Sequence, residues 1–279
     1  MIKVLHPGIY CSVQDYGRIG FAKMGIPQAG AMDAYAAKKA NMLLNHKKQE
    51  AVLEITYGQG KFEFTSKTLI VLTGGDFSPK LNSDPIQMNR AHAVKKGDVL
   101  SFGKRNYGAR VYLAVKGGIQ SETVLNSKSF YPGITALKLS KGALLKINAV
   151  KTDVVKNFSK IRSFSSHFTE PYLICNPGPE FERLSFSQKQ ELSKPFSISE
   201  NNNRVGYRLN EPIANDLQPI LTSAVLPGTV QLTPSGKLIV LMRDCQVTGG
   251  YPRVLQLSDY AISRLSQKVA GEIVQFALE

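Results

Sequence analysis

The chain has 279 residues, 43% of them apolar, with 35 Lys and Arg against 21 Asp and Glu and a formal net charge of +14. This length fits one large domain or two small ones, no apolar run approaches the ~18 residues of a membrane helix, and the N-terminus does not resemble a secretory signal. The basic residues form no arginine-rich stripe and no nucleic-acid-binding motif, so we expect neither nucleic-acid nor membrane binding but an attraction for anionic substrates or an acidic partner. Three widely separated cysteines indicate a reducing, cytoplasmic setting.

The predicted elements are mainly β-strands. Short segments rich in β-branched and aromatic residues predict strands at 2–5, 69–72, 99–102, 110–115, 144–147, 172–175, 230–232, 237–242 and 273–276. An alanine-rich stretch predicts a helix over 32–44 with Asp33 as its N-cap. Further short helices are predicted at 180–186 and at 258–265, the latter opening on Ser258. Many short strands with few helices favour closed barrels or sandwiches.

The two halves of the chain resemble each other weakly. Residues 60–76 and 236–251 each contain a strand that leads to a Gly-Gly pair. This similarity predicts two related β-domains, at 1–150 and 170–279. The polar segment 151–169 between them is rich in Lys and Ser and is predicted to be a linker.

A polar cluster follows the predicted strand 237–242. Within nine positions, 244–252, it contains a carboxylate, two hydroxyls and two adjacent glycines: Asp244, Thr248, Gly249, Gly250 and Tyr251. Such a strand end delivers polar side chains to the rim of a sheet, and glycines let the backbone approach a second group closely. The alternative is a tight hairpin in which Asp244 binds its own turn, because turns use the same residue types.

A second polar cluster lies near the N-terminus. Gln14, Asp15, Arg18 and Asp33 all fall in glycine-rich segments that follow a short apolar opening. Loops carry binding and catalytic groups more often than packed elements do. Two such clusters at strand ends call for a joint explanation, and our hypothesis is that they converge on one cleft.

The motifs also resemble a known family. Eight of them occur in the order found there, at 14–20, 30–33, 40–41, 53–54, 117–119, 203–208, 228–231 and 244–252. The chain resembles the biotin-dependent carboxyltransferase-domain family, also called allophanate hydrolase subunit 2 or KipA, which includes the C subunit of bacterial 5-oxoprolinase. The resemblance covers nearly the whole chain and implies two cyclophilin-like β-barrel domains. The segment 125–142 departs from the family pattern, so the specificity of a site formed there would differ.

The resemblance implies a subunit of an ATP-dependent 5-oxoprolinase that opens 5-oxoproline to glutamate together with a KipI-type B subunit and an A subunit. The alternatives are a non-catalytic regulatory partner of a KipI-type protein and a carboxyltransferase-like component acting on urea or a similar small amide. The chain has no biotin-attachment motif and no Walker-type loop. We therefore expect no biotin on this chain and ATP only at the level of the complex.

The chemistry assigns provisional roles to the two clusters. Lactam opening and carboxyl transfer both need a carboxylate base and donors that hold an oxyanion. Asp244 and Asp15 are the candidate carboxylates, with Thr248 and Tyr251 as hydroxyl donors. The guanidinium groups of Arg18, Arg204 and Arg208 would clamp a substrate carboxylate or phosphate. The other predicted substrate-binding residues are Gln14, Asp33, Gln231, Gly249 and Gly250.

Structural roles compete with several of these assignments. Asp33 is more easily explained as a helix cap. Glu54 is equally explained as a buried partner of Arg18, and the two arginines of 203–208 as locks on the loops of the second domain. The four histidines are scattered without ligand spacing, so no metal site is predicted.

Overall fold

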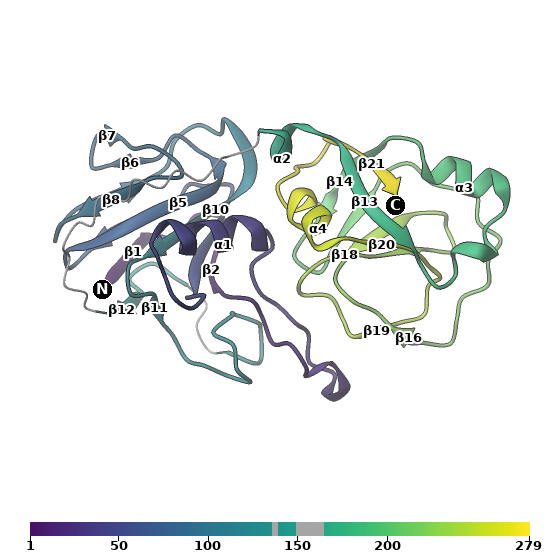
Figure 1. Cartoon of the computed structure of the whole chain (residues 1–279), viewed down its shortest axis with the longest axis horizontal. Coiled ribbons are helices and arrows are strands. Elements are labelled where there is room, and N and C mark those ends of the chain that lie inside the picture. The colour runs from purple at the N-terminus through teal and green to yellow at the C-terminus, as the bar shows by residue number, and fades with distance from the viewer. Residues whose placement is uncertain (136–138, 149–164) are drawn as a thin grey trace. The chain divides into compact units, whose positions relative to one another are not determined.

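The computed structural model describes residues 1–135, 139–148 and 165–279. Its internal contacts divide the chain into two compact units (Figure 1). Unit 1 comprises Met1–Gly17 and Asp33–Ser165, and unit 2 comprises Arg18–Met32 and Ser166–Glu279. The segment Arg18–Met32 therefore groups with the C-terminal part of the chain, which the sequence pattern did not indicate. Most of the predicted linker 151–169 lies outside the described residues, and its last four residues form helix α2, Ser166–Thr169.

Unit 1 is built from two sheets. The seven-stranded sheet has the order β11-β12-β1-β4-β9-β6-β7, and the five-stranded sheet has the order β2-β3-β10-β5-β8. Their bounds are β1 Ile2–His6, β2 Tyr10–Gln14, β3 Val52–Thr56, β4 Lys61–Phe64, β5 Thr68–Asp76, β6 Lys80–Leu81, β7 Asp84–Pro85, β8 Ala91–Val94, β9 Val99–Ser101, β10 Tyr107–Val115, β11 Ile119–Gln120 and β12 Leu144–Ile147. One apolar core joins the sheets, with Phe62 and Leu100 from the first and Leu53, Leu72 and Val111 from the second.

Helix α1, Ala34–Leu43, packs against the five-stranded sheet. The Oδ1 atom of Asp33 accepts a hydrogen bond from the backbone N–H of Ala36 at 2.8 Å, which confirms the predicted N-cap. The hydroxyl of Thr73 in β5 donates to the carbonyl of Ala36 at 2.7 Å and fixes the helix on the sheet. The helix is slightly shorter than the predicted 32–44 and carries Asn41 near its C-terminal end.

Unit 2 contains a closed barrel with the strand order β13-β20-β17-β18-β15-β14-β21. The bounds are β13 Tyr172–Pro177, β14 Phe196–Asn202, β15 Gly206–Leu209, β17 Thr229–Leu232, β18 Leu238–Leu241, β20 Arg253–Leu257 and β21 Ile273–Leu278. Alternate residues such as Val230, Val240 and Leu255 fill its interior. A two-stranded sheet of β16, Ser223–Ala224, and β19, Thr248–Gly249, forms separately from the barrel. The prediction of a mainly β chain with a few short helices is confirmed.

The helices of unit 2 correct one prediction. In place of a helix over 180–186, the chain forms a 3-10 turn, η2 at Phe181–Arg183, and then helix α3 at Phe186–Leu192. The start moved because Ser185 and Gln188 form a reciprocal capping box, a signal that the prediction overlooked. Helix α4, Asp259–Leu265, begins after the cap Ser258 as predicted. Unit 2 also includes the 3-10 turn η1, Ala22–Met24.

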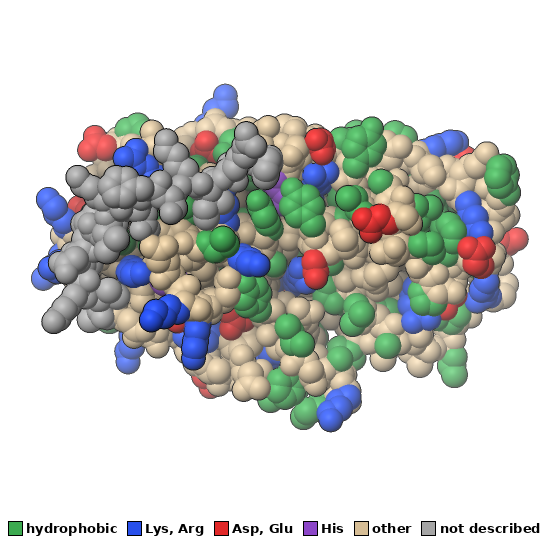
Figure 2. Space-filling view, in the orientation of Figure 1, with side chains coloured by type: hydrophobic (Ala, Val, Ile, Leu, Met, Phe, Trp, Pro, Cys, Tyr) green, Lys and Arg blue, Asp and Glu red, His purple; other side chains and the backbone are tan. Residues whose placement is uncertain are grey.

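Basic side chains are scattered over the face of the molecule shown in Figure 2, with acidic and apolar side chains between them. No helix among the described residues is long and apolar enough to cross a membrane.

Candidate functional site

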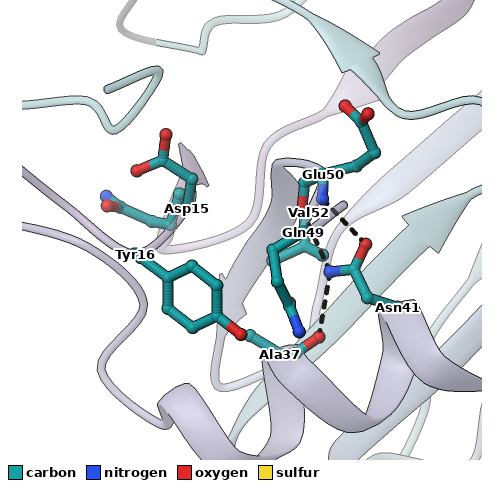
Figure 3. A pocket seen from close by; sticks show the side chains of 8 residues that line it. Asp15, Tyr16, Ala37, Asn41, Gln49, Glu50 and Val52 are labelled. Carbon is teal, nitrogen blue, oxygen red and sulfur yellow. Dashed lines mark hydrogen bonds between the residues drawn. The ribbon is translucent and has the colours of Figure 1, made fainter. Parts of the chain in front are cut away.

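Unit 1 contains a small pocket at the end of β2, beside helix α1 (Figure 3). It is partly open to solvent, and the space available to the centre of a water-sized molecule is only about 10 Å³. Its lining combines amides, carboxylates, a phenol and two apolar side chains: Gln14, Asp15, Tyr16, Ala37, Asn41, Gln49, Glu50 and Val52. Residues from β2, α1 and the start of β3 thus meet around one opening, and burial raises the pKa of the Tyr16 phenol at its edge.

Asp15 is held by the loop that departs from the family pattern. Its Oδ1 accepts hydrogen bonds from the hydroxyls of Ser127 and Ser129, both at 2.6 Å, and from the N–H of Gly17 at 2.8 Å. Its Oδ2 accepts the backbone N–H of Lys128 at 2.6 Å. Four donors on one carboxylate make Asp15 an anchor for residues 127–129, and only Oδ2 keeps spare acceptor capacity.

Glu50 is positioned from both sides. The Asn41 side chain binds its backbone twice, because Nδ2 donates to the Glu50 carbonyl and Oδ1 accepts the Glu50 N–H, each at 3.0 Å (Figure 3). The Glu50 carboxylate lies against Gly118, where a Cβ atom would come within 2.5 Å of Oε2. The ammonium of Lys128 lies 3.7 Å from the same oxygen. Residues of three family motifs, at 14–20, 40–41 and 117–119, therefore shape this one pocket.

Gln14 is completely buried and has one unused polar atom. Its Nε2 donates to Ser12 Oγ at 2.9 Å and to the carbonyl of Phe130 at 3.4 Å. Its Oε1 meets no donor among the described residues. An unpaired acceptor costs free energy when it is buried, so this oxygen is a local cost to the stability of unit 1.

A buried polar network lies under helix α1. Register pairs Glu54 of β3 with Tyr112 of β10, and the Tyr112 hydroxyl donates to Glu54 Oε2 at 2.9 Å. The same hydroxyl accepts the N–H of Asp33 at 2.7 Å, and Arg110 Nε lies 3.7 Å from Glu54. Burial, and then the charges of Glu54 and Asp33, raise the pKa of Tyr112 well above its usual value. The network ties the start of α1 to the sheet, while the Arg18 pairing predicted for Glu54 stays a prediction.

The central feature of the polar cluster in unit 2 is a buried ion pair. Arg204 donates from Nε to Asp244 Oδ2 at 2.7 Å and from Nη2 to Oδ1 at 2.8 Å. The Nη2 atom also donates to the carbonyl of Gly30 at 2.7 Å, and the N–H of Ala29 donates to the carbonyl of Arg243. Both ion-pair side chains are only 8% exposed. Among the hydrogen bonds of the described residues, the Asp244 carboxylate binds Arg204 and not its own turn, and Arg204 in turn binds Gly30 of the segment Arg18–Met32.

The glycines of this cluster permit close packing. A Cβ atom on Gly249 would lie 2.7 Å from Gln231 Nε2, and one on Gly250 would lie 2.8 Å from the carbonyl oxygen of Ile220. The buried Nε2 atom of Gln231 meets no acceptor among the described residues. Thr248 and Tyr251 are exposed residues.

The predicted site residues thus fall into two groups. Gln14 and Asp15 meet in unit 1, together with Asn41, Gln49 and Glu50, which the prediction missed. Arg204 meets Asp244, and Gln231 meets Gly249, in unit 2. Arg18 is buried in unit 2, whereas Arg208 is exposed and donates to the carbonyl of Asn201. A shared cleft for the two clusters stays a prediction.

The fold and these motifs define a class of protein. The carboxyltransferase domain family, subdomain A and B, matches residues 24–278, and the chain belongs to this family. It is 34% identical to the C subunit of 5-oxoprolinase from Escherichia coli, covering 99% of this chain and 90% of that protein. It is 26% identical to the corresponding 5-oxoprolinase protein of Haemophilus influenzae with the same coverage. The solved urea carboxylase of Kluyveromyces lactis superposes with a TM-score of 0.89 at 25% identity, covering 99% of this chain but only 27% of that one.

Proposed function

We propose that this chain is the C-type subunit of an ATP-dependent 5-oxoprolinase, which opens 5-oxoproline to glutamate together with A-type and B-type subunits. The observation that carries the proposal is the share of each relative's length that this chain covers. Proteins named as the C subunit of 5-oxoprolinase align with this chain over 90% of their own length, whereas the urea carboxylase aligns over 27% of its length. The name of those relatives implies further subunits, and the B-type subunit is the KipI-type partner.

Under this proposal ATP binds elsewhere in the complex, and this chain carries no biotin. The complex is cytoplasmic, in keeping with three buried free cysteines at positions 11, 175 and 245. The exposed hydroxyls of Thr248 and Tyr251 are the groups of the unit 2 cluster that reach substrate. Asp244 is buried in its ion pair with Arg204, so it positions Arg204 and the segment Arg18–Met32 and is not a freely accessible base.

A carboxyl-transfer role is the second candidate. It is supported by the family itself and by the close structural match to a urea carboxylase. In that case the substrate is urea or a similar small amide, and the carboxyl carrier belongs to another protein. The two candidates differ in their products, because ring opening yields glutamate and carboxyl transfer yields a carboxylated amide.

Reconstitution tests the proposal. The chain is co-expressed with A-type and B-type subunits, the complex is isolated by size exclusion, and glutamate formation from 5-oxoproline is followed with and without ATP. We expect turnover that needs ATP and all three subunits. Equal turnover by the A-type and B-type subunits without this chain would refute the proposal, and carboxylation of urea in the presence of a carboxybiotin donor would favour the second candidate.

One variant tests the exposed phenol within that complex. Tyr251 is 40% exposed, so Tyr251→Phe removes a hydroxyl without opening a cavity. If the hydroxyl holds developing charge, turnover falls by roughly 10²-fold or more while the melting temperature stays unchanged. Tyr172→Phe, at a position 50% exposed in β13, is the matched control and is expected to keep full turnover. Wild-type turnover of Tyr251→Phe would remove this residue from the mechanism.

A further inference from the structure

The seven-stranded sheet of unit 1 has one face on the core and one face turned outward. Along its strands, residues that contribute to the core alternate with outward residues, as Phe62 alternates with its neighbours in β4. Four exposed lysines occupy outward positions of this sheet: Lys3 of β1, Lys61 of β4, Lys80 of β6 and Lys146 of β12. We call the surface that these four side chains form the lysine face.

Strand register brings the lysines together. Lys61 and Lys80 are both paired with Ser101 of β9, one from each side. Their Cα atoms are therefore two strand spacings apart, about 10 Å. Lys3 is paired with Glu63, which lies two residues from Lys61 on the same side of β4. The four lysines thus lie on five neighbouring strands, β12-β1-β4-β9-β6, and not at scattered points of the surface.

The charge of the lysine face is not balanced from within. At the outward positions of these five strands, the described residues supply four lysines and one carboxylate, Glu63, whereas the whole chain has 35 basic against 21 acidic residues. None of the four ammonium groups forms an ion pair with a carboxylate of the described residues. Lysines about 10 Å apart are only partly screened from one another at physiological ionic strength, where the Debye length is about 8 Å. An anionic surface that docks on the lysine face relieves this repulsion.

The residue types indicate which anion fits. Among the described outward residues of these five strands there is no Arg, Phe, Tyr or Trp. Single-stranded nucleic acids are bound by aromatic stacking, and phosphate groups are matched best by the fork of an arginine. The lysine face offers instead separate point charges, with Leu144, which is 53% exposed, and the half-buried Val99 among them. This mixture complements a protein surface on which carboxylates lie among aliphatic side chains.

We propose that the lysine face docks an acidic segment of a partner protein, one that carries several Asp or Glu side chains. Their carboxylates accept hydrogen bonds from the lysine ammonium groups, and Leu144 contacts the aliphatic side chains between them. The proposal does not rest on the proposed function, because it concerns the charge of one sheet face and not the reaction.

Binding is tested with the full chain and fluorescein-labelled peptides. A hexaglutamate peptide is the acidic probe, and an uncharged peptide of alternating glycine and serine with the same length and label is the control. We expect saturable binding of hexaglutamate alone in fluorescence anisotropy, with an affinity that falls as salt is added. A labelled hexanucleotide of single-stranded DNA and vesicles that contain phosphatidylserine are measured for comparison. Tighter binding of either one than of hexaglutamate, or no saturable binding of the peptide, would overturn the proposal.

Two variants of equal charge separate the lysine face from the general basic charge of the chain. The face variant combines Lys3→Gln, Lys61→Gln and Lys80→Gln, and it is expected to raise the dissociation constant of hexaglutamate about tenfold. The control variant removes three exposed charges from α1, which packs on the other sheet, and from the segment after it: Lys38→Gln, Lys47→Gln and Lys48→Gln. It should change the dissociation constant by no more than about twofold. Equal weakening by the two variants would refute the proposal, because binding would then follow net charge alone.

Removing the carboxylate of the lysine face should act in the opposite direction. Glu63→Gln is expected to lower the dissociation constant of hexaglutamate about twofold, since it removes the negative charge beside Lys3. This single change tests the same surface even if the face variant fails to fold. An unchanged or higher dissociation constant for Glu63→Gln would contradict docking at this face.

Discussion

Breaking the ion pair between Arg204 and Asp244 is expected to destabilise unit 2 severely. Three hydrogen bonds of the Arg204 guanidinium, two to Asp244 and one to the carbonyl of Gly30, are at most 2.8 Å long, and both side chains are 8% exposed. Removing one partner leaves a buried charge without compensation, which costs about 3–5 kcal/mol. For a unit of this size, that loss lowers the melting temperature by on the order of 10 °C.

A double-mutant cycle measures the pair directly. Asp244→Leu and Arg204→Met each leave one charge, whereas the double variant leaves none, so it should cost less than the sum of the two by about 1–3 kcal/mol. Cys245, which is 3% exposed beside Asp244 and whose pKa burial raises to about 12, reports opening of unit 2 through thiol labelling resolved by mass spectrometry. Chemical unfolding followed by this label gives the free energy of unfolding of the unit that carries the pair.

An exposed ion pair is the control for the cycle. Lys189 and Glu182 are 2.7 Å apart, but the Glu182 side chain is 82% exposed. We expect Glu182→Gln to cost less than about 1 kcal/mol. If Asp244→Leu costs no more than Glu182→Gln, or if the two buried-pair variants add without coupling, the structural role assigned to Asp244 is wrong.

Three further predictions concern unit 1. Burial, and then the charge of Lys116, lower the pKa of His46 below 6.5, so the unfolded state binds the proton first. The stability that neutral His46 contributes is complete above about pH 6.5, and it is lost as the pH drops towards the folded-state pKa. In thermal melts at a series of pH values, His46→Gln should therefore flatten the fall of the melting temperature with decreasing pH. An unchanged slope would contradict the reasoning. Gly118→Ala should lower the free energy of unfolding of the unit, measured in urea, more than Gly97→Ala does. Both glycines have a positive φ, but only at Gly118 would a new Cβ come within 2.5 Å of a neighbour, Glu50. Equal losses of unfolding free energy would exclude that clash. Asp33→Ala should cost about 1 kcal/mol by the same measurement through loss of the cap of α1, whereas Asp33→Ser, which keeps an acceptor, should recover most of it.

Local sequence signals were sufficient for the elements of secondary structure. Short segments rich in β-branched and aromatic residues predicted strands such as β5, β10 and β21, and the caps Asp33 and Ser258 marked the starts of α1 and α4. These signals depend on residues a few positions apart, so they can be recognised from the sequence alone. The start of α3 was missed although its capping box, Ser185 with Gln188, is equally local.

The candidate sites depended on contacts between distant parts of the chain. Asp15 and Asp244 looked alike in sequence, as carboxylates in glycine-rich loops, yet one binds the loop 127–129 and the other binds Arg204, 40 positions away. Glu50 carried no motif of its own, and only the approach of Asn41 and Gly118 shows why it is positioned.

The sequence by itself therefore determined the mainly β composition, the helix caps, the order of the family motifs and the residue types available for chemistry. Only the tertiary structure decided which partners neutralise each charge and which polar atom stays unused. The physical reason is that burial and hydrogen-bond pairing arise where segments far apart in sequence meet, as Gln14 and Phe130 do, and no local pattern encodes that meeting.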